Sequence, residues 1–382
     1  MRSLPLNVFR NLDNQKKMAK NPIDLRRKKY FKLSSHIAQL NNLQLRSLLS
    51  NGEINESSTG WGTNQTIFLE SFPVFVKHIP VTTLEYENLF STKNLYHLPT
   101  SYHYGIDSPG LGVFRELLTH IRTTHWVLEE AIAAFPLMYH YRIMPFAGPC
   151  VDVETGRWGN HPNVLNYVLD RANASYELVL FLEYIPYVLE TWLWENPNQL
   201  QNSLAQICKT IAFLRTKGII HFDAHFRNIL TDGEQTYLTD FGLALDKSFA
   251  LTKDEEDFFE RNTFYDYGEV LRNLGHLIRS PYYSRSENDK RKLMEKYGIT
   301  EGLQPCEVGA ILLDNIEQIH ANEDLVLDKF YVANIVKYRS IIAVMQNFFS
   351  KMWGNDKKDT ELPHAELQQL LKKTGFLSQY EY

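Results

Sequence analysis

The sequence predicts an α+β protein in which a smaller strand-rich part precedes a larger helical part. Runs of β-rich composition occur in the first half, at residues 65–79, 137–144 and 177–185. In the second half the apolar residues instead follow helical spacing, at 200–215 and 331–352. With 382 residues, of which 44% are hydrophobic, the chain can bury one large or two medium cores. We therefore expect three regions, which are a basic helical extension at 1–50, a strand-rich lobe at 51–185 and a helical lobe at 186–382.

The first strands are predicted to form a β-hairpin. Residues 66–69 and 74–79 have strand composition, and turn-forming residues at 71–73 separate them. Further along the strand-rich lobe, helices are expected at 113–128 and 163–172.

The helical lobe has two clear helical patterns. Leu200, Leu204, Ile207 and Ile211 share one face of the first, and Gly218 stands where a helix would end. Charged residues interrupt the second pattern, so it does not predict a membrane span. Two shorter helices are expected at 253–261 and 365–373.

Positive charge is concentrated at the start of the chain, although the net charge is -5. The densest basic run is Arg26 to Lys29. It predicts a solvated helix face, or alternatively a docking site for a polyanion such as an inositol phosphate or an anionic lipid. No aromatic residues interleave with these charges, which argues against nucleic acid as a partner.

Cysteine and histidine usage indicates no structural metal or disulfide framework. The three cysteines are odd in number and far apart, and the spacing of His120 and His125 is poor for zinc. The N-terminus also lacks the apolar core of a signal peptide. A soluble protein of a reducing compartment, the cytoplasm, is expected.

The segment HFDAHFRNILTDGEQTYLTDFG, residues 221–242, predicts a site built around a hairpin. Strand-forming residues flank Asp232 and Gly233, so the chain folds back and brings Asn228 close to Asp240. Two oxygen ligands on rigid backbone suit Mg²⁺, which completes its octahedron with phosphate oxygens and water.

This segment resembles the catalytic and metal-binding loops of the protein-kinase-like superfamily. The pattern H-x-D-x-x-x-x-N followed by D-F-G is matched by His221, Asp223, Asn228 and residues 240–242. The resemblance implies a two-lobed kinase fold that uses ATP and Mg²⁺. It also implies that Asp223 positions an acceptor hydroxyl and accepts its proton, while Asn228 and Asp240 hold the metal.

The resemblance extends upstream to a lysine on a strand. Residues 74–77, VFVK, are similar to the family's V-A-I-K, which makes Lys77 the phosphate-binding lysine, and Gly60 and Gly62 precede it as a phosphate-covering loop. Gln65 replaces the third glycine of that loop.

Glu116 is the expected carboxylate partner of Lys77, and this choice requires an insertion at 80–112. Glu85 and Glu87 are the alternatives for that role. The pair Gly110 and Gly112, immediately before a helix, is a rival phosphate loop.

The run YELVLFLEYIP, residues 176–186, resembles the fifth strand and hinge of the family. That alignment makes Leu182 the gatekeeper. It implies that the Glu183 carbonyl and the Ile185 N–H bind the adenine ring.

Several positions depart from the protein-kinase pattern. Phe222 stands where many protein kinases have an arginine that senses a phosphorylated activation loop, and His225 stands where they have a lysine. The loop is therefore closer to the aminoglycoside and choline kinase branch, and His225 could bind the transferring phosphate. No A-P-E follows D-F-G, Asp266 is expected to brace the catalytic loop, and residues 147–175 form a second insertion.

The sequence favours an Mg²⁺-dependent ATP phosphotransferase acting on a hydroxyl of a protein or a small molecule. Two other functions remain open on the same fold. One is a pseudokinase that acts as a nucleotide-responsive binding module, which the incomplete glycine loop favours. The other is transfer of AMP, which would require ATP to bind in the reversed direction.

Overall fold

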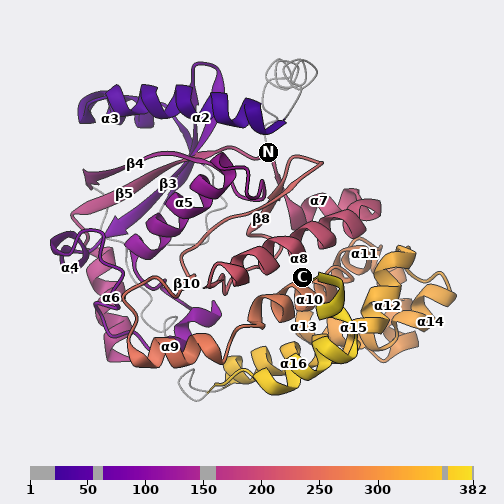
Figure 1. Cartoon of the computed structure of the whole chain (residues 1–382). Helices are drawn as coiled ribbons and strands as arrows, with labels where there is room; N and C mark the ends of the chain where they lie inside the picture. The colour runs from indigo at the N-terminus through magenta and orange to yellow at the C-terminus, as the bar shows by residue number, and fades with distance from the viewer. Residues whose placement is uncertain (1–21, 55–62, 147–160, 355–359, 381–382) are drawn as a thin grey trace. The chain divides into compact units, whose positions relative to one another are not determined.

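The structure is a computed structural model that describes residues 22–54, 63–146, 161–354 and 360–380 (Figure 1). Its internal contacts divide the chain into two compact units. Unit 1 comprises Met1–Leu98 with Pro109–Ile185, and unit 2 comprises Pro99–Ser108 with Pro186–Tyr382. Residues 99–108 thus belong to unit 2, although the residues before and after them in the sequence belong to unit 1.

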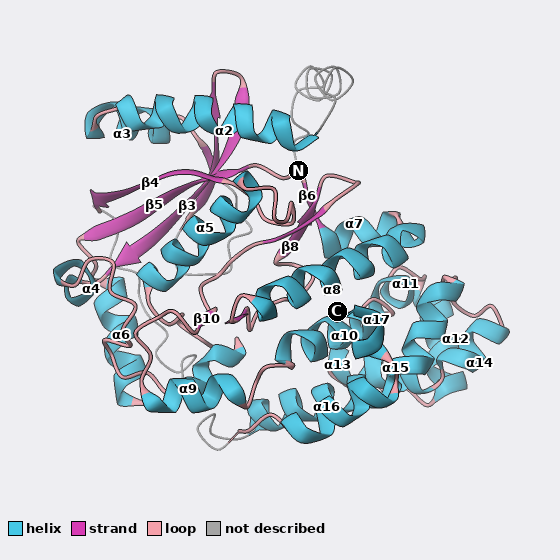
Figure 2. Cartoon of the chain, viewed as in Figure 1, coloured by secondary structure: helices cyan, strands magenta, loops and turns pink. Residues whose placement is uncertain are grey.

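Unit 1 is built on an antiparallel five-stranded sheet of order β1-β2-β3-β5-β4 (Figure 2). The strands are β1 (Glu53–Ile54), β2 (Asn64–Leu69), β3 (Phe72–Val81), β4 (Met138–Pro145) and β5 (Tyr176–Glu183). The helices are α2 (Pro22–Gln39), α3 (Asn42–Ser50), α4 (Thr83–Glu87), α5 (Val113–Leu128) and α6 (Pro162–Ala172).

The two faces of this sheet are covered by α2 and α5 (Figure 1). Side chains alternate along a strand, so Leu178, Leu180 and Leu182 of β5 share one face. They pack with Phe114 and Leu117 of α5 in the hydrophobic core of unit 1. Glu183, the residue after Leu182, faces the other side of the sheet, where its side chain contacts Arg26 of α2.

The predicted hairpin is present, but its turn is shorter than expected. Glu70 and Ser71 both have positive φ, 50° and 69°, which is the backbone of a tight two-residue hairpin turn. Pro73 was expected in the turn and instead pairs with Phe68 inside the strands. Because the two-residue turn needs no further residues, β3 begins at Phe72.

The basic run of α2 is the predicted solvated face only at Lys28, which is exposed, and at Arg27, whose side chain is 39% exposed. Arg26 and Lys29 point into unit 1: the side chain of Arg26 is 12% exposed, and burial lowers the pKa of Lys29, an effect that the nearby Glu183 carboxylate opposes. Lys29 also lies over the rings of Phe72 and Tyr139. The charges of Arg26 and Lys29 therefore serve the packing of α2 on the sheet, and the polyanion site on this basic run stays a prediction.

Unit 2 is mainly helical. Its helices are η1 (Thr100–Tyr104), α7 (Leu189–Glu195), η3 (Pro197–Gln199), α8 (Leu200–Thr216), α9 (Lys253–Glu260), α10 (Tyr265–His276), α11 (Arg279–Tyr283), α12 (Glu287–Tyr297), α13 (Pro305–Asp314), α14 (Ile316–Ala321), α15 (Lys329–Gly354), α16 (His364–Lys373) and α17 (Phe376–Tyr380). Its short strands are β6 (Tyr187–Val188), β7 (Ile219–Ile220), β8 (Ile229–Thr231), β9 (Thr236–Leu238) and β10 (Leu245–Asp246).

The long helix α15 is central to unit 2 because it packs along α10 and also contacts α8, α14 and α16. Gly268 and Gly275 of α10 allow the close approach, since a Cβ at Gly268 would lie 2.6 Å from the Met345 sulfur and one at Gly275 would lie 3.1 Å from Ile342. The helices predicted at 200–215, 253–261, 331–352 and 365–373 are confirmed, with ends that differ by at most two residues. Within the described residues, no helix combines the length and the apolar character that a membrane crossing requires.

Candidate active site

Lys77 lies on β3 and forms an ion pair with Glu116 of α5. The Lys77 Nζ is 2.6 Å from Glu116 Oε1, and the two side chains are 18% and 7% exposed. Helix and strand are held in this position by the core beneath them, since Ile79 and Val81 on the same face of β3 pack against α5. His120, one turn after Glu116, has its Nε2 3.8 Å from the same carboxylate oxygen. Unit 1 therefore presents a partly exposed ammonium group fixed by a buried carboxylate.

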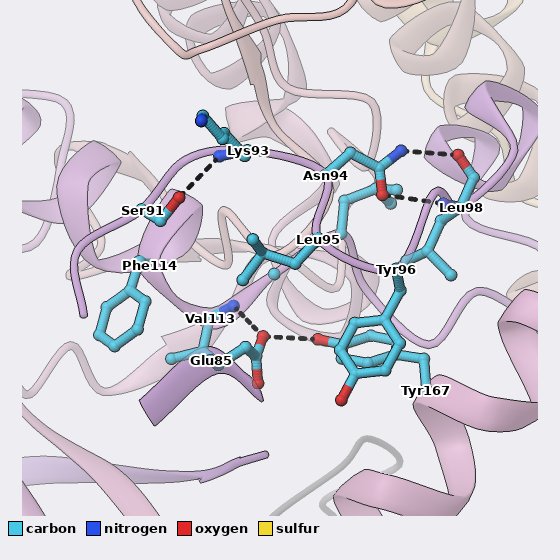
Figure 3. A pocket seen from close by; sticks show the side chains of 12 residues that line it. Glu85, Ser91, Lys93, Asn94, Leu95, Tyr96, Leu98, Val113, Phe114 and Tyr167 are labelled. Carbon is cyan, nitrogen blue, oxygen red and sulfur yellow. Dashed lines mark hydrogen bonds between the residues drawn. The ribbon is translucent and has the colours of Figure 1, made fainter. Parts of the chain in front are cut away.

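Glu85 and Glu87, the alternative partners of Lys77, have other surroundings. Glu85 is buried and caps two helices: its Oε2 accepts from the Thr82 N–H at 3.0 Å, and its Oε1 accepts from Val113 N–H and the Tyr167 hydroxyl, each at 3.1 Å (Figure 3). Glu87 is exposed. The bond to Val113 also places a protein carboxylate at the N-terminus of α5, which argues against Gly110 and Gly112 as a phosphate loop.

Gly60 and Gly62, the expected phosphate-covering glycines, lie outside the described residues. Gln65, which replaces the third glycine, is a buried residue of β2. Its side-chain amide lies 2.9 Å from His78 Nε2, and a Cβ added at Gly52 would be only 2.4 Å from its oxygen. Gln65 is therefore fitted into the sheet.

The end of β5 carries the three residues expected to bind adenine. Leu182 is buried in the core against α5, and Ile185 is half-buried after the strand. The Glu183 carboxylate accepts from Arg26 Nη2 at 2.7 Å and from the Leu137 N–H at 3.1 Å. Burial alone would raise the pKa of Glu183, but the Arg26 charge and these hydrogen bonds outweigh burial and hold that pKa below its usual value.

The hairpin of residues 229–238 brings Asn228 next to the D-F-G sequence, as the sequence predicted. Ile229 pairs with Leu238 in β8 and β9. One step further, the Thr239 N–H donates to the Asn228 carbonyl at 3.0 Å. Asp240 follows directly, and its left-handed backbone, φ 65°, turns the chain away from the strand. Such a conformation is costly for a residue other than glycine and is found mainly where function requires it.

Asp223 is held in place by Asn228. The Asn228 Nδ2 donates to the Asp223 carboxylate oxygen Oδ2 at 2.7 Å and to the Asp223 carbonyl at 3.1 Å. His225 lies on the other side, with its Nε2 3.4 Å from Asp223 Oδ1. Burial raises the pKa of Asp223, and the charge of Asp240 adds to this rise, while His225 and Asn228 oppose it. The two carboxylates therefore share one local environment.

Asp266 holds the backbone at the start of residues 221–228, the expected catalytic loop. Its two carboxylate oxygens accept from the backbone N–H groups of His221 and Phe222, at 2.8 and 2.9 Å. Phe222 also has a left-handed backbone, φ 64°, so these two bonds stabilise a strained turn. Burial raises the pKa of Asp266 to about 7.

The atoms of unit 2 suit a divalent cation. Since Asn228 directs its Nδ2 toward Asp223, its amide oxygen is the atom left to bind a cation. Asp240 is the carboxylate next along the chain from the hairpin, and its charge raises the pKa of Asp223. One amide and one carboxylate oxygen form the sparse ligand set that Mg²⁺ accepts when phosphate and water complete its shell.

Comparison with known proteins supports a relationship to the protein-kinase-like superfamily. Residues 154–273 match the family model described as the protein kinase domain. The match contains Asp223, Asn228, Asp240 and Asp266 but not Lys77. A Caenorhabditis elegans protein named cyclin-dependent kinase 4 homolog is 33% identical over 99 residues, which cover 23% of this chain and 24% of that protein. The small antiparallel sheet of unit 1 and the helical unit 2 agree with a kinase fold.

Proposed function

We propose that this protein is an ATP-dependent phosphotransferase that acts on a hydroxyl acceptor. The observation that carries the proposal is the arrangement in unit 2, where Asn228 hydrogen-bonds Asp223 and the hairpin brings Thr239, the residue before Asp240, back to Asn228. The ion pair of Lys77 and Glu116 in unit 1 supports it, because the same pair of residue types binds ATP phosphates in kinases.

Each residue has a proposed role. Lys77 neutralises phosphate oxygens and Glu116 orients Lys77. Asn228 and Asp240 would hold Mg²⁺, which would neutralise charge on the phosphates.

In the transfer step, the acceptor oxygen bonds to the γ-phosphorus as the bond to the β–γ bridging oxygen breaks, so that ADP leaves. The hydroxyl proton passes to Asp223. Of its two carboxylate oxygens, Oδ2 already accepts from Asn228, so we assign the proton to Oδ1.

Leu182, Glu183 and Ile185 are proposed to bind adenine through the end of β5. The buried ion pair of Arg26 with Glu183 supports this proposal because it fixes the end of β5. Arg26 binds the carboxylate of Glu183, so the backbone carbonyl that is proposed to bind adenine is not the group that the pair uses. Gly60 and Gly62 remain proposed phosphate-loop residues on sequence grounds alone.

Two acceptor classes remain candidates. The match to a protein kinase domain favours a serine or threonine hydroxyl of a protein. Phe222 and His225, which replace the arginine and lysine of that pattern, favour a small-molecule alcohol as in the aminoglycoside and choline kinase branch. His225 is close enough to Asp223 Oδ1 to contact a phosphate that is being transferred to an acceptor there.

The test is to incubate the purified full-length chain with Mg²⁺ and either γ-labelled or α-labelled ATP, adding a protein extract in one arm and a mixture of hydroxylated metabolites in the other. Label transferred from the γ-position alone is expected, and the arm in which it appears identifies the acceptor class. Label from the α-position would indicate AMP transfer, and absence of label from both would favour a binding module. The Asp240→Ala variant should lose the signal, and its persistence would refute the metal assignment.

A further inference from the structure

Residues 99–108 leave unit 1 and return to it, yet they pack within unit 2. Their 3₁₀ helix η1 is buried, including Ser101, Tyr102, His103 and Tyr104. The rings of Tyr102 and Tyr104 are buried there, so the segment is part of the core of unit 2. The sequence alone did not reveal this, because nothing in the local pattern distinguishes these residues from the rest of the insertion.

Two side chains anchor this segment to the catalytic machinery. The His103 ring Nδ1 donates to the Leu243 carbonyl at 2.8 Å, directly after the D-F-G sequence. The same ring lies 5.1 Å from the ring of Phe222 in the catalytic loop. The Tyr104 hydroxyl donates to Asn262 Oδ1 at 3.0 Å, and its ring packs on Phe258 at 5.1 Å. The segment thus contacts the proposed catalytic loop at Phe222, the residue after the D-F-G sequence at Leu243, and α9 at Phe258.

Gly105 follows these anchors and lies against the proposed base. A Cβ added at Gly105 would be 3.2 Å from Asp223 Oδ1, the oxygen that Asn228 leaves uncovered, and 3.5 Å from Leu243. The backbone of Gly105 is left-handed, φ 78°, which favours glycine. The Nε2 of His225 lies 3.4 Å from the same oxygen. The approach to Asp223 Oδ1 is therefore bounded by Gly105 and His225.

We propose that residues 99–108 form a fixed wall of the acceptor site, and that Gly105 is the position that keeps Asp223 Oδ1 accessible to the acceptor hydroxyl. His103 and Tyr104 are positioning residues that hold the wall in place. The inference rests on the proposed function, because it gives Asp223 Oδ1 the role of proton acceptor. It predicts that a methyl group at residue 105 blocks the approach to Asp223 Oδ1.

The first test measures access to the carboxylate and requires no activity. The full-length protein is treated with a water-soluble carbodiimide and glycine ethyl ester, and amidation of Asp223 is quantified by peptide mass spectrometry. Gly105→Ala is expected to reduce amidation of Asp223 several-fold. Gly302→Ala is the matched control, because Gly302 also belongs to unit 2 and has φ 86° but has nothing within 4 Å of an added Cβ. Equal amidation of Asp223 in the two variants would overturn the proposal.

The second test uses water as the smallest acceptor. ADP release from Mg²⁺-ATP is compared with the affinity for a fluorescent ATP analogue. Gly105→Ala should lower turnover while the affinity stays unchanged, and Gly302→Ala should change neither. Unchanged turnover in Gly105→Ala would reject the role of residues 99–108 as a wall of the acceptor site, and it would leave the proposed function standing. Absence of hydrolysis in the unmodified protein, together with no label transfer from γ-labelled ATP, would instead reject the proposed function and this inference with it.

A variant of the anchor keeps the inference testable if Gly105→Ala does not fold. His103→Leu removes the donor to the Leu243 carbonyl, whereas His103→Asn retains an N–H near the position of Nδ1. His103→Leu is expected to accelerate hydrogen exchange of the amides at 105–108 and to lower turnover at unchanged nucleotide affinity. In His103→Asn, the slow hydrogen exchange of these amides and the turnover should both be partly restored. Equal exchange and turnover in the two variants would contradict the positioning role.

Discussion

At the scale of single residues, the buried pair of Arg26 and Glu183 contributes most clearly to the stability of unit 1. Arg26 donates to both carboxylate oxygens and also to the carbonyls of Ala133 and Phe135. A guanidinium suits this role because its planar fork can serve several acceptors at once. The pair joins the basic helix to the end of β5, where the adenine contacts are proposed.

Arg26→Gln is expected to destabilise the protein by about 3 kcal/mol at neutral pH, since removing one partner leaves a buried charge uncompensated. Arg26 lowers the pKa of Glu183, so the stability that the pair provides is present above the carboxyl's ordinary pKa and is lost as the pH falls through the lowered value. In the variant, burial is opposed only by the Lys29 charge and the Leu137 N–H, so the pKa of Glu183 rises relative to the unmodified protein. The difference in unfolding free energy between unmodified protein and variant should therefore shrink from pH 7.5 to pH 4.5.

Urea unfolding at the two pH values measures this difference. Arg27→Gln is the matched control, because the neighbouring Arg27 pairs with Glu130 at the surface, where the two side chains are 39% and 51% exposed. An exposed pair of this kind contributes less than about 1 kcal/mol. The buried pair would not act as described if Arg26→Gln lowered the free energy of unfolding no more than Arg27→Gln does. The same conclusion would follow if the loss in Arg26→Gln were larger at pH 4.5 than at pH 7.5.

At the scale of elements, the proposed catalytic loop, residues 221–228, depends on Asp266. The loop contains the strained Phe222, and both oxygens of Asp266 are used to hold the backbone there. Asparagine at this position offers one acceptor oxygen and turns an N–H group toward the second backbone donor. Asp266→Asn should destabilise unit 2 by about 1 to 3 kcal/mol, the cost of one unsatisfied buried donor.

The pH dependence of this loss has the opposite sign to that of Arg26→Gln. Burial raises the pKa of Asp266 to about 7, whereas an unfolded aspartate has a pKa of about 3.9. Between these values the folded state binds the extra proton, so the stability of the unmodified protein falls as the pH rises. The variant lacks this carboxyl. Its deficit in thermal unfolding should be larger at pH 5 than at pH 8, and a deficit that does not change with pH would exclude an ionisable Asp266 with a raised pKa.

The elements that the sequence predicts well are those determined by local patterns. The hairpin of residues 229–238 follows from strand composition around Asp232 and Gly233, and α8 and α15 follow from the spacing of apolar residues. The first hairpin was predicted with the wrong turn, because Pro73 indicates a turn by composition although Glu70 and Ser71 form it. Propensity describes one residue, while the register of the strands decides where the chain reverses.

The features that the sequence did not predict depend on partners distant in the chain. Arg26 and Glu183 are 157 positions apart, and His103 and Leu243 are 140 positions apart. A basic run gives no sign of which carboxylate it will meet, so Arg26 was expected in solvent. Gly105 could not be recognised for the same reason, since its significance comes from Asp223 beside it and not from its own neighbours.

At the scale of the whole molecule, the chain is divided into two units with separate cores. In unit 1 the core lies between the sheet and α5, and in unit 2 it is organised around α10 and α15. Multidomain proteins commonly open unit by unit rather than in a single step. The stability of each unit can therefore be changed separately.

Hydrogen exchange followed by mass spectrometry tests this division with the two variants already described. Arg26→Gln removes a contact internal to unit 1, so exchange should accelerate in β3 and β5 while α10 and α15 keep their protection. Asp266→Asn removes a contact internal to unit 2 and should have the reverse effect. Equal acceleration of both sets of amides in either variant would mean that the chain opens as one cooperative body, in which case the loss of activity in any single variant could not be assigned to the unit that carries it.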